Sequence, residues 1–282
     1  MSLLQAIVLG IVQGLTEFLP ISSSGHLILV PWLLGWNVFH GNQDLNKTFD
    51  VALHLGTFVA ALAYFRREIV VIVRAWLRSL ARRSVKTPDE RLAWLLLIST
   101  IPAGLVGVAF ESFVEDRLGQ PWLICIMMVG FGLVMLAVDM TARARKDMGD
   151  LRYGGALGIG VAQAIALAPG VSRSGITMVT GLLIGLDRES AARYSFLLSV
   201  PVVGGAALLK LGQLAANGMP AHMLTPFIAG TVAAAISGLA AIWFLLDYLR
   251  KHTFAVFVGY RLVVGVALLL VIATGLRHAT GI

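Results

Sequence analysis

The chain has 282 residues, of which 58% are hydrophobic and 13% are charged, and its mean hydropathy is +0.85. Soluble domains carry about a quarter charged residues, so this composition excludes a soluble globular protein and indicates an integral membrane protein. The formal net charge of +7 lies in short basic clusters between apolar runs, which is typical of membrane topology. We therefore expect no nucleic-acid partner.

The first apolar region, residues 3–36, is interrupted by the polar stretch E-F-L-P-I-S-S-S-G-H, from Glu17 to His26. A continuous membrane helix would leave this stretch inside the hydrocarbon. Proline ends a helix and serine is a good N-cap, so Pro20 predicts the end of one half-helix and the serines the start of another. The first basic residue is Lys47, so the N-terminal stretch has no positively charged region, and we expect no cleavable signal peptide.

Six further stretches are apolar and long enough to cross a bilayer, which takes about 20 helical residues. They are residues 48–66, 91–112, 120–142, 190–213, 223–249 and 254–276. A second interrupted region, 153–186, is broken between Pro169 and Gly175. The predicted fold class is an all-α polytopic membrane protein, with six transmembrane helices and two re-entrant helix-loop-helix regions in one membrane domain, residues 1–282.

The two interrupted regions match each other at an offset of 150 residues. G-I-V-Q (10–13) aligns with G-V-A-Q (160–163), and S-S-S-G (22–25) aligns with S-R-S-G (172–175). Two matches in register predict a duplication, with repeat one at 1–150 and repeat two at 151–282. Each half then crosses the membrane an odd number of times, so the sequence predicts an inverted-topology repeat.

The distribution of basic residues agrees with this topology. Most of the 22 basic residues fall in four loops, which the inverted repeat places on one side of the membrane: 66–91, 143–152, 188–193 and 250–251. The positive-inside rule makes that side the cytoplasm. The first broken region then enters from outside and the second from the cytoplasm. Irregular backbone at membrane depth must be buried in protein or line a wet cavity, so we expect a site where the two tips meet.

The second tip, P-G-V-S-R-S-G-I-T from Pro169 to Thr177, has the features of an anion site. Ser172 or Ser174 can cap the outgoing half-helix, whose N-terminal N–H groups attract anions. Arg173 adds a permanent cation whose planar fork matches phosphate oxygens. The plainer alternative is that Arg173 reaches a polar surface or pairs with one acid for folding.

The first tip has the same form with different side chains. Any of its serines can be a plain helix cap, but His26 lies three residues beyond Ser23, so proton transfer between them is geometrically allowed. Glu17 and Gln13 lie one and two turns before the break. Glu17 could orient the histidine, hold a divalent cation or pair with Arg173. Together the tips predict a phosphate-handling site for a substrate with a lipid tail.

These motifs resemble the bacterial undecaprenyl-diphosphate phosphatase family of the bacitracin-resistance type. Q-G-L-T-E-F-L-P-I-S-S-S-G-H resembles its (E/Q)-x-x-x-E and S-S-x-G-H elements, and P-G-V-S-R-S-G-I-T its P-G-x-S-R-S-x-x-T element. The likeness extends to K-T-F-D-V (47–51), F-L-L-S-V-P (196–201) and the pair Tyr260 and Arg261. It implies an enzyme that hydrolyses undecaprenyl diphosphate to undecaprenyl phosphate and inorganic phosphate, recycling the lipid carrier for cell-wall synthesis.

The resemblance also implies roles for particular residues. Ser23 would be the nucleophile with His26 as its base, or His26 the nucleophile with Ser23 positioning; Glu17 would hold Mg²⁺ or Ca²⁺, and Arg173 would bind the phosphates. The other expected substrate-binding residues are Ser22, Ser24, Ser172, Ser174, Thr177 and Gln13. Many members have a second glutamate where this chain has Gln13, which weakens a two-carboxylate metal site.

The resemblance implies a multi-pass protein of the cytoplasmic (inner) membrane whose active site opens to the periplasmic or outer side. A homodimer is one candidate assembly. The strongest alternative is a polyprenyl-phosphate transporter or flippase that uses the same inverted-repeat site. Asp50 and His54 either line the cavity or hold helices together, whereas Asp139 and Arg261 are expected to snorkel or form ion pairs near cytoplasmic helix ends. The basic run from Arg66 to Arg91 is expected to extend a helix along anionic headgroups.

Overall fold

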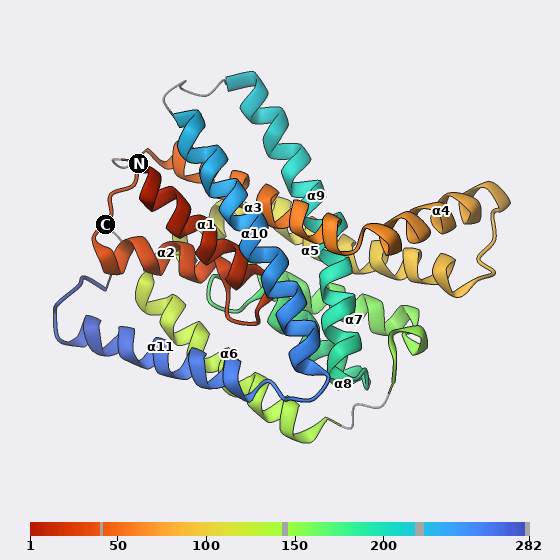
Figure 1. The fold of residues 1–282 in the computed structure, drawn as a ribbon. Coiled ribbons are helices and arrows are strands. Elements are labelled where there is room, and N and C mark those ends of the chain that lie inside the picture. Colours follow the sequence, from red (N-terminus) through yellow and green to blue (C-terminus); the bar gives the residue numbers. More distant parts are fainter. Residues whose placement is uncertain (40–41, 143–145, 218–222, 280–282) are drawn as a thin grey trace.

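The computed structural model describes residues 1–39, 42–142, 146–217 and 223–279 (Figure 1). Within these residues every named element is helical. The helices are α1 (Leu3–Phe18), α2 (Ser23–Leu34), α3 (Gln43–Tyr64), α4 (Arg66–Arg82), α5 (Pro88–Leu118), α6 (Pro121–Thr141), the 3-10 helix η1 (Met148–Asp150), α7 (Tyr153–Ile165), α8 (Arg173–Ile184), α9 (Arg188–Asn217), α10 (Leu224–Leu249) and α11 (Ala255–Ala273).

Both helix breaks predicted from the sequence are present. The helix α1 ends at Phe18, and the residue before Pro20 is extended, as a following proline requires. The helix α2 starts after its N-cap Ser22. The second break separates α7 from α8, whose N-cap is Ser172, and it contains Gly170 at φ 100°, a conformation that glycine adopts without strain.

The two breaks have the same local geometry at the predicted offset. Ser22 and Ser172 both have positive φ, 80° and 81°, which is unusual for serine. Each serine hydroxyl accepts a hydrogen bond from the backbone N–H three residues later. The half-helices α2 and α8 each have 12 residues and end at a left-handed glycine, Gly35 and Gly185. The sequence matches therefore correspond to matching backbone.

The first half-helix of each pair packs against a helix from the other half of the chain. The helix α1 lies along α10, and α7 lies along α5 (Figure 1). Both crossings are close: a Cβ on Gly10 would lie 2.3 Å from the Gly230 carbonyl oxygen, and one on Gly160 would lie 2.6 Å from that of Ser99. Gly10 and Gly160 occupy equivalent positions at the offset of 150 residues.

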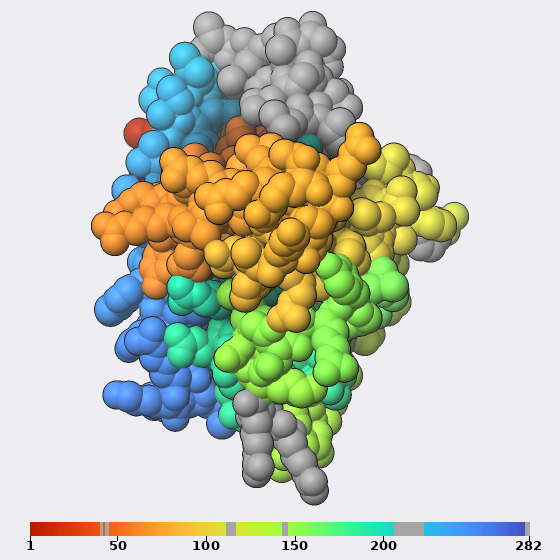
Figure 2. Space-filling model, turned by 90° about the vertical axis from the view of Figure 1, so that its right-hand side faces the viewer, coloured from red at the N-terminus to blue at the C-terminus, as the bar shows by residue number. Residues whose placement is uncertain are grey.

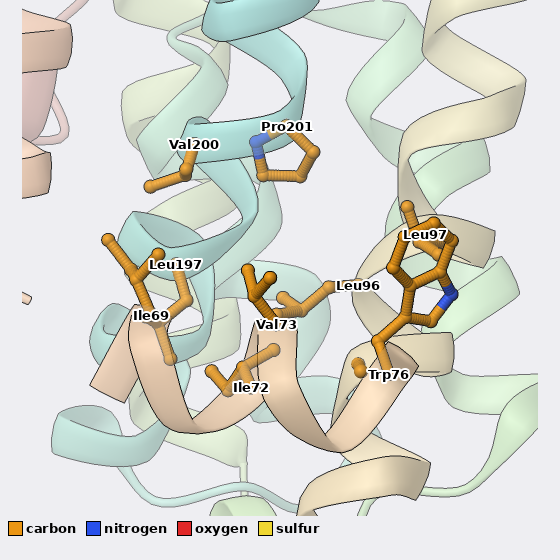
Figure 3. Close-up of a pocket in the computed structure, with 10 residues that line it drawn as sticks. Ile69, Ile72, Val73, Trp76, Leu96, Leu97, Leu197, Val200 and Pro201 are labelled. Atoms are coloured by element: carbon orange, nitrogen blue, oxygen red, sulfur yellow. The ribbon is translucent and has the colours of Figure 1, made fainter. Parts of the chain in front are cut away.

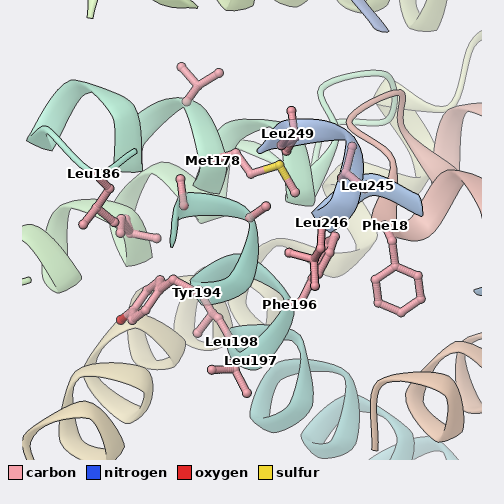
Figure 4. Packing of buried hydrophobic residues seen from close by; sticks show 14 of the residues in the cluster. Phe18, Met178, Leu186, Tyr194, Phe196, Leu197, Leu198, Leu245, Leu246 and Leu249 are labelled. Atoms are coloured by element: carbon pink, nitrogen blue, oxygen red, sulfur yellow. The ribbon is translucent and has the colours of Figure 1, made fainter. Parts of the chain in front are cut away.

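The main hydrophobic core joins residues of α1, α8, α9 and α10 (Figure 4). Phe18, the last residue of α1, meets Phe196 of α9 edge to face, with ring centroids 5.3 Å apart. Met178 of α8 and Leu245 of α10 belong to the same cluster. The helices α9 and α10 thus hold the half-helices α1 and α8 in place.

Four helices are long and apolar enough to cross a membrane, by length and composition, in the described part of the chain. They are Pro88–Phe110, Pro121–Thr141, Leu224–Leu249 and Ala255–Ala273, close to four of the spans expected from the sequence. The other two expected spans, 48–66 and 190–213, lie almost wholly in α3 and in α9, and their crossing stays a prediction. The fold is that of a multi-pass membrane protein.

The basic run after Arg66 forms a helix of its own, α4, rather than an extension of α3. It turns back at Arg83 and forms a projecting hairpin with α5, and α4 covers much of the face seen in Figure 2. Between α4, α5 and α9 lies an apolar groove of about 250 Å³, lined by residues that include Ile69, Val73 and Leu97 (Figure 3).

Candidate active site

Glu17 is the centre of a cluster that joins the two breaks. Its side chain is 5% exposed, and one carboxylate oxygen, Oε1, accepts from Arg173 Nη2 at 2.9 Å. The other oxygen, Oε2, accepts from Ser23 Oγ at 2.6 Å and from Gln13 Nε2 at 3.1 Å. The structure therefore brings four of the predicted site residues together, and the tips of the two broken regions meet as expected.

Serines on each tip bind the backbone of the other tip. The hydroxyl oxygen of Ser22 accepts from the N–H of Gly170 at 3.0 Å, and Ser174 donates to the carbonyl of Leu19 at 3.1 Å. Ser24 lies 3.5 Å from Ser22, and Ser172 lies 3.1 Å from Ser174. Because each tip supplies the partner for buried backbone of the other, neither is expected to keep its shape alone.

The cluster has the features of an anion site. The N-termini of α2 and α8, with their partial positive charges, lie at the two breaks. Arg173 Nη1 is buried and has no hydrogen-bond partner among the described residues, although Nη2 is paired with Glu17. Buried donors are nearly always satisfied, so this N–H indicates a ligand with an acceptor oxygen.

His26 does not pair with Ser23, contrary to one arrangement that the sequence allowed. Its Nδ1 donates to the carbonyl of Ser22 at 2.7 Å, and its Nε2 lies 2.8 Å from the hydroxyl of Tyr260, on whose ring it also stacks. The reason is geometric: the hydroxyl of Ser23 points back to Glu17, six residues earlier. In this arrangement the group that can take the proton of Ser23 is the Glu17 carboxylate.

His54 lies at the edge of the same cluster, and the prediction that it lines a cavity with Asp50 stays a prediction. Its Nε2 is 3.7 Å from Glu17 Oε2, and its side chain is 35% exposed. Its Nδ1 donates to the backbone carbonyl of Asp50 at 2.7 Å, which fixes the direction of the ring. His54 therefore adds a polar group to the Glu17 side of the site.

Thr177 faces away from the cluster. Its hydroxyl is buried, donates to the carbonyl of Arg173 at 2.9 Å and lies 2.7 Å from the hydroxyl of Ser195 in α9. Thr177 therefore supports the turn of α8 that carries Arg173. Its link to the Glu17 cluster runs through Arg173.

The expectation that Arg261 snorkels or forms an ion pair near a helix end is wrong. Instead of snorkelling or ion pairing at a helix end, its side chain is fully buried and donates to backbone carbonyls, among them those of Pro20 and Gly170 in the two breaks. The signal was an arginine inside an apolar helix, which marks a functional site by default. Asp139, in contrast, pairs with Arg188 at 2.6 Å as expected.

The oxygen atoms beside Arg173 suit a hard cation such as Mg²⁺ or Ca²⁺. No group of three or more His, Cys, Asp or Glu residues that could hold a metal occurs in the described part of the chain. Glu17 and the side-chain carbonyl of Gln13 are the protein oxygens at hand, and Gln13 Oε1 is buried without a hydrogen-bond partner among described residues. These two side chains are too few to hold such a cation by themselves.

Fold and site together define a multi-pass helical membrane protein with a carboxylate, a serine and an arginine at the meeting point of two helix breaks. The family model described as "Bacitracin resistance protein BacA" matches residues 6–267, and the chain belongs to this family. All the site residues described above lie within the matched range.

Several curated relatives cover nearly the whole chain. A protein of Pelobacter propionicus named "Undecaprenyl-diphosphatase" is 47% identical over 98% of this chain and 99% of its own length. Proteins with the same name from Moorella thermoacetica and Geobacter sulfurreducens are 47% and 46% identical, covering 93% and 95% of this chain and 95% and 98% of their own.

Proposed function

We propose that the chain is an undecaprenyl-diphosphate phosphatase, which hydrolyses undecaprenyl diphosphate to undecaprenyl phosphate and inorganic phosphate. Membership of the BacA family and the names of the relatives support this activity. The observation that carries the proposal is the Glu17–Arg173 pair with Ser23 hydrogen-bonded to the same carboxylate. A hydroxyl held 2.6 Å from a carboxylate suits hydrolysis, so a transporter or flippase is not favoured.

Ser23 is the proposed nucleophile. Its oxygen attacks the terminal phosphorus while its proton passes to Glu17, and the bond from that phosphorus to the bridging oxygen breaks, releasing undecaprenyl phosphate. Water then hydrolyses the phosphoserine and releases inorganic phosphate. His26 is disfavoured as base or nucleophile because both its ring nitrogens have protein partners.

Arg173 is the proposed phosphate-binding residue. Phosphoryl transfer depends on positioning and on neutralising the charge of the transferred group. The unpartnered Nη1 of Arg173 and the N-termini of α2 and α8 offer donors to phosphate oxygens. These helix termini are held in place by the hydroxyl groups of four serines, Ser22, Ser24, Ser172 and Ser174.

A divalent cation, Mg²⁺ or Ca²⁺, is proposed as cofactor, with Glu17 as ligand and Gln13 as a neutral oxygen donor. When bound, it would neutralise phosphate charge and polarise the phosphoryl group. With a single carboxylate ligand, the protein contributes little of the energy that binds the cation. The affinity of the site for the cation is therefore expected to depend on the substrate phosphates.

The proposed topology has six transmembrane helices and two re-entrant regions, arranged as inverted repeats 1–150 and 151–282. The matching backbone at the two breaks and the reciprocal packing of α1 on α10 and α7 on α5 support the repeat. The distribution of basic loops supports placement in the cytoplasmic membrane with the active site open to the outer side. A homodimer stays a prediction.

Phosphate release from undecaprenyl diphosphate by the purified protein in detergent tests the activity. We expect release that stops when a chelator removes divalent cations and returns when Mg²⁺ or Ca²⁺ is added back. No release with any divalent cation would contradict the phosphatase and leave the transporter as the better interpretation. Release that continues at the same rate in the presence of chelator would contradict the divalent-cation cofactor but not the phosphatase activity.

A further inference from the structure

Arg261 of α11 contacts both helix breaks at once. Its Nη1 donates to the carbonyl of Pro20 at 3.3 Å and its Nη2 to that of Gly170 at 2.5 Å, although 150 residues separate these two acceptors. Its Nε donates to the carbonyl of Met128 in α6 at 3.1 Å. One guanidinium thus ties both breaks to a membrane-spanning helix.

The surroundings of Arg261 explain why an arginine is used. The residue is fully buried, and no ion pair with a carboxylate is found for it among the described residues. Its charge is offset by carbonyl dipoles and by the ring of Phe131, whose centroid lies 5.0 Å from the guanidinium carbon. Break carbonyls cannot join a helix ladder, and when buried they need donors from elsewhere. Only a rigid fork with five N–H groups can serve acceptors on three segments at once.

The residue beside Arg261 makes a second contact to the first break. The hydroxyl of Tyr260 lies 2.8 Å from His26 Nε2, while His26 Nδ1 donates to the carbonyl of Ser22. Consecutive residues of α11 therefore hold the first break through its backbone and through its histidine. The proposed nucleophile, Ser23, lies in sequence between Pro20 and His26, the two residues that these contacts hold.

We propose that Arg261 is a positioning residue of the active site, which fixes the break carrying Ser23 relative to the break carrying Arg173. This inference rests on the proposed phosphatase function. Arg261 touches no reacting atom; it acts by keeping the Ser23 hydroxyl and the Arg173 guanidinium in place on the two oxygens of Glu17.

The test compares Arg261→Lys with Arg188→Lys, the same change at an arginine that pairs with Asp139 outside the site. A lysine keeps the charge but cannot reach carbonyls on both breaks. Displacing reacting groups by about 1 Å lowers rates about 100-fold, so we expect kcat to fall about 100-fold in Arg261→Lys with KM changed less than about threefold. Arg188→Lys should keep kcat near wild type.

Hydrogen exchange supplies a readout that does not depend on activity. In Arg261→Lys, amide exchange should rise in both breaks, residues 19–25 and 168–175, and stay at the wild-type level in both breaks of Arg188→Lys. Exchange that is unchanged in either break, or a kcat equal to that of Arg188→Lys, would overturn the inference. If the wild type releases no phosphate, the proposed function fails, and the exchange data still decide the structural part.

If Arg261→Lys unfolds, Phe131→Leu takes its place. This change removes the ring beneath the guanidinium and leaves every carbonyl acceptor in position, so kcat should fall severalfold and exchange should rise in both breaks. Wild-type kcat and exchange in Phe131→Leu would then overturn the inference.

Discussion

At the scale of single residues, one carboxylate organises the site. Glu17 is nearly buried, and its two oxygens divide the partners: Arg173 binds one, and Ser23 and Gln13 bind the other. A buried carboxylate needs such partners, because burying an unpaired charge is very unfavourable. The proposed mechanism uses the same contacts, since they place a proton acceptor beside the Ser23 hydroxyl and a guanidinium on the other side of that acceptor.

The shared hydrogen bond predicts that Glu17 and Ser23 act as a unit. Glu17→Gln and Ser23→Ala should each lower kcat/KM on the order of 100- to 1,000-fold, and the double variant should be little worse than either single one. His26→Gln should have a smaller effect, because His26 holds backbone and Tyr260 rather than the Ser23 hydroxyl.

Steady-state phosphate release measures these effects. Thr180→Ala is the control, since it removes a helix hydroxyl of α8 that, among the described residues, bonds only the carbonyl of Ile176 in its own helix. Additive losses for Glu17 and Ser23, or a larger loss for His26→Gln than for Ser23→Ala, would assign the base to His26 instead.

The limits of prediction from sequence are clear at this scale. The contact of Glu17 with Ser23 is local in sequence, yet the sequence-based prediction paired Ser23 with His26 instead. The partner of His26 was not foreseeable, because Tyr260 is 234 residues away. Arg261 was misjudged for the same reason: its acceptors are backbone carbonyls of distant loops, which leave no mark in side-chain chemistry.

At the scale of helices, the half-helices are held by close crossings. Gly160 of α7 lies against the backbone of α5, whereas a Cβ built on Gly158 of the same helix would have no described atom from outside its own helix backbone within 4 Å. Small residues at such crossings let backbones approach, which is how membrane helices gain packing without a hydrophobic driving force.

This difference predicts opposite effects of one chemical change. Gly160→Ala should lower the stability of the protein by about 1–3 kcal/mol through overpacking. Gly158→Ala should be neutral or stabilising by up to about 1 kcal/mol, because alanine favours helix over glycine. Thermal unfolding in detergent measures both, and equal effects at the two positions would contradict the close crossing of α7 and α5.

At the scale of the whole molecule, two helix breaks of matching backbone geometry meet, and the half-helix before each break packs against a helix from the other half of the chain. The sequence alone predicted both breaks and most of the helices. The signals were the apolar runs, the Pro and Gly residues that interrupt them, and the offset of 150 residues. The packing of α1 on α10 and of α7 on α5 could not be predicted, because period and hydropathy identify helices but not their neighbours. The separate helix α4 was missed because its basic residues read as a continuation of α3.

The proposed topology predicts which loops face the cytoplasm. In a Cys125→Ser background, which removes the chain's one cysteine, Val85→Cys and His252→Cys lie in loops from different halves of the chain. Both should react with a membrane-impermeant maleimide only after the cytoplasmic side is opened. Thr274→Cys, after α11, should react from outside in intact cells, and labelling of Val85 and His252 from opposite sides would contradict the inverted repeat.

The proposal that two helix breaks form one phosphatase site depends on Arg173. Phosphate release from undecaprenyl diphosphate should be compared for the wild type and Arg173→Ala, with Arg188→Ala as a second arginine deletion and melting temperatures recorded for all three. We expect Arg173→Ala to lose on the order of 1,000-fold in kcat/KM while remaining folded, because removing it leaves the charge on the phosphoryl group without its guanidinium partner. Near-wild-type release by folded Arg173→Ala would contradict the site.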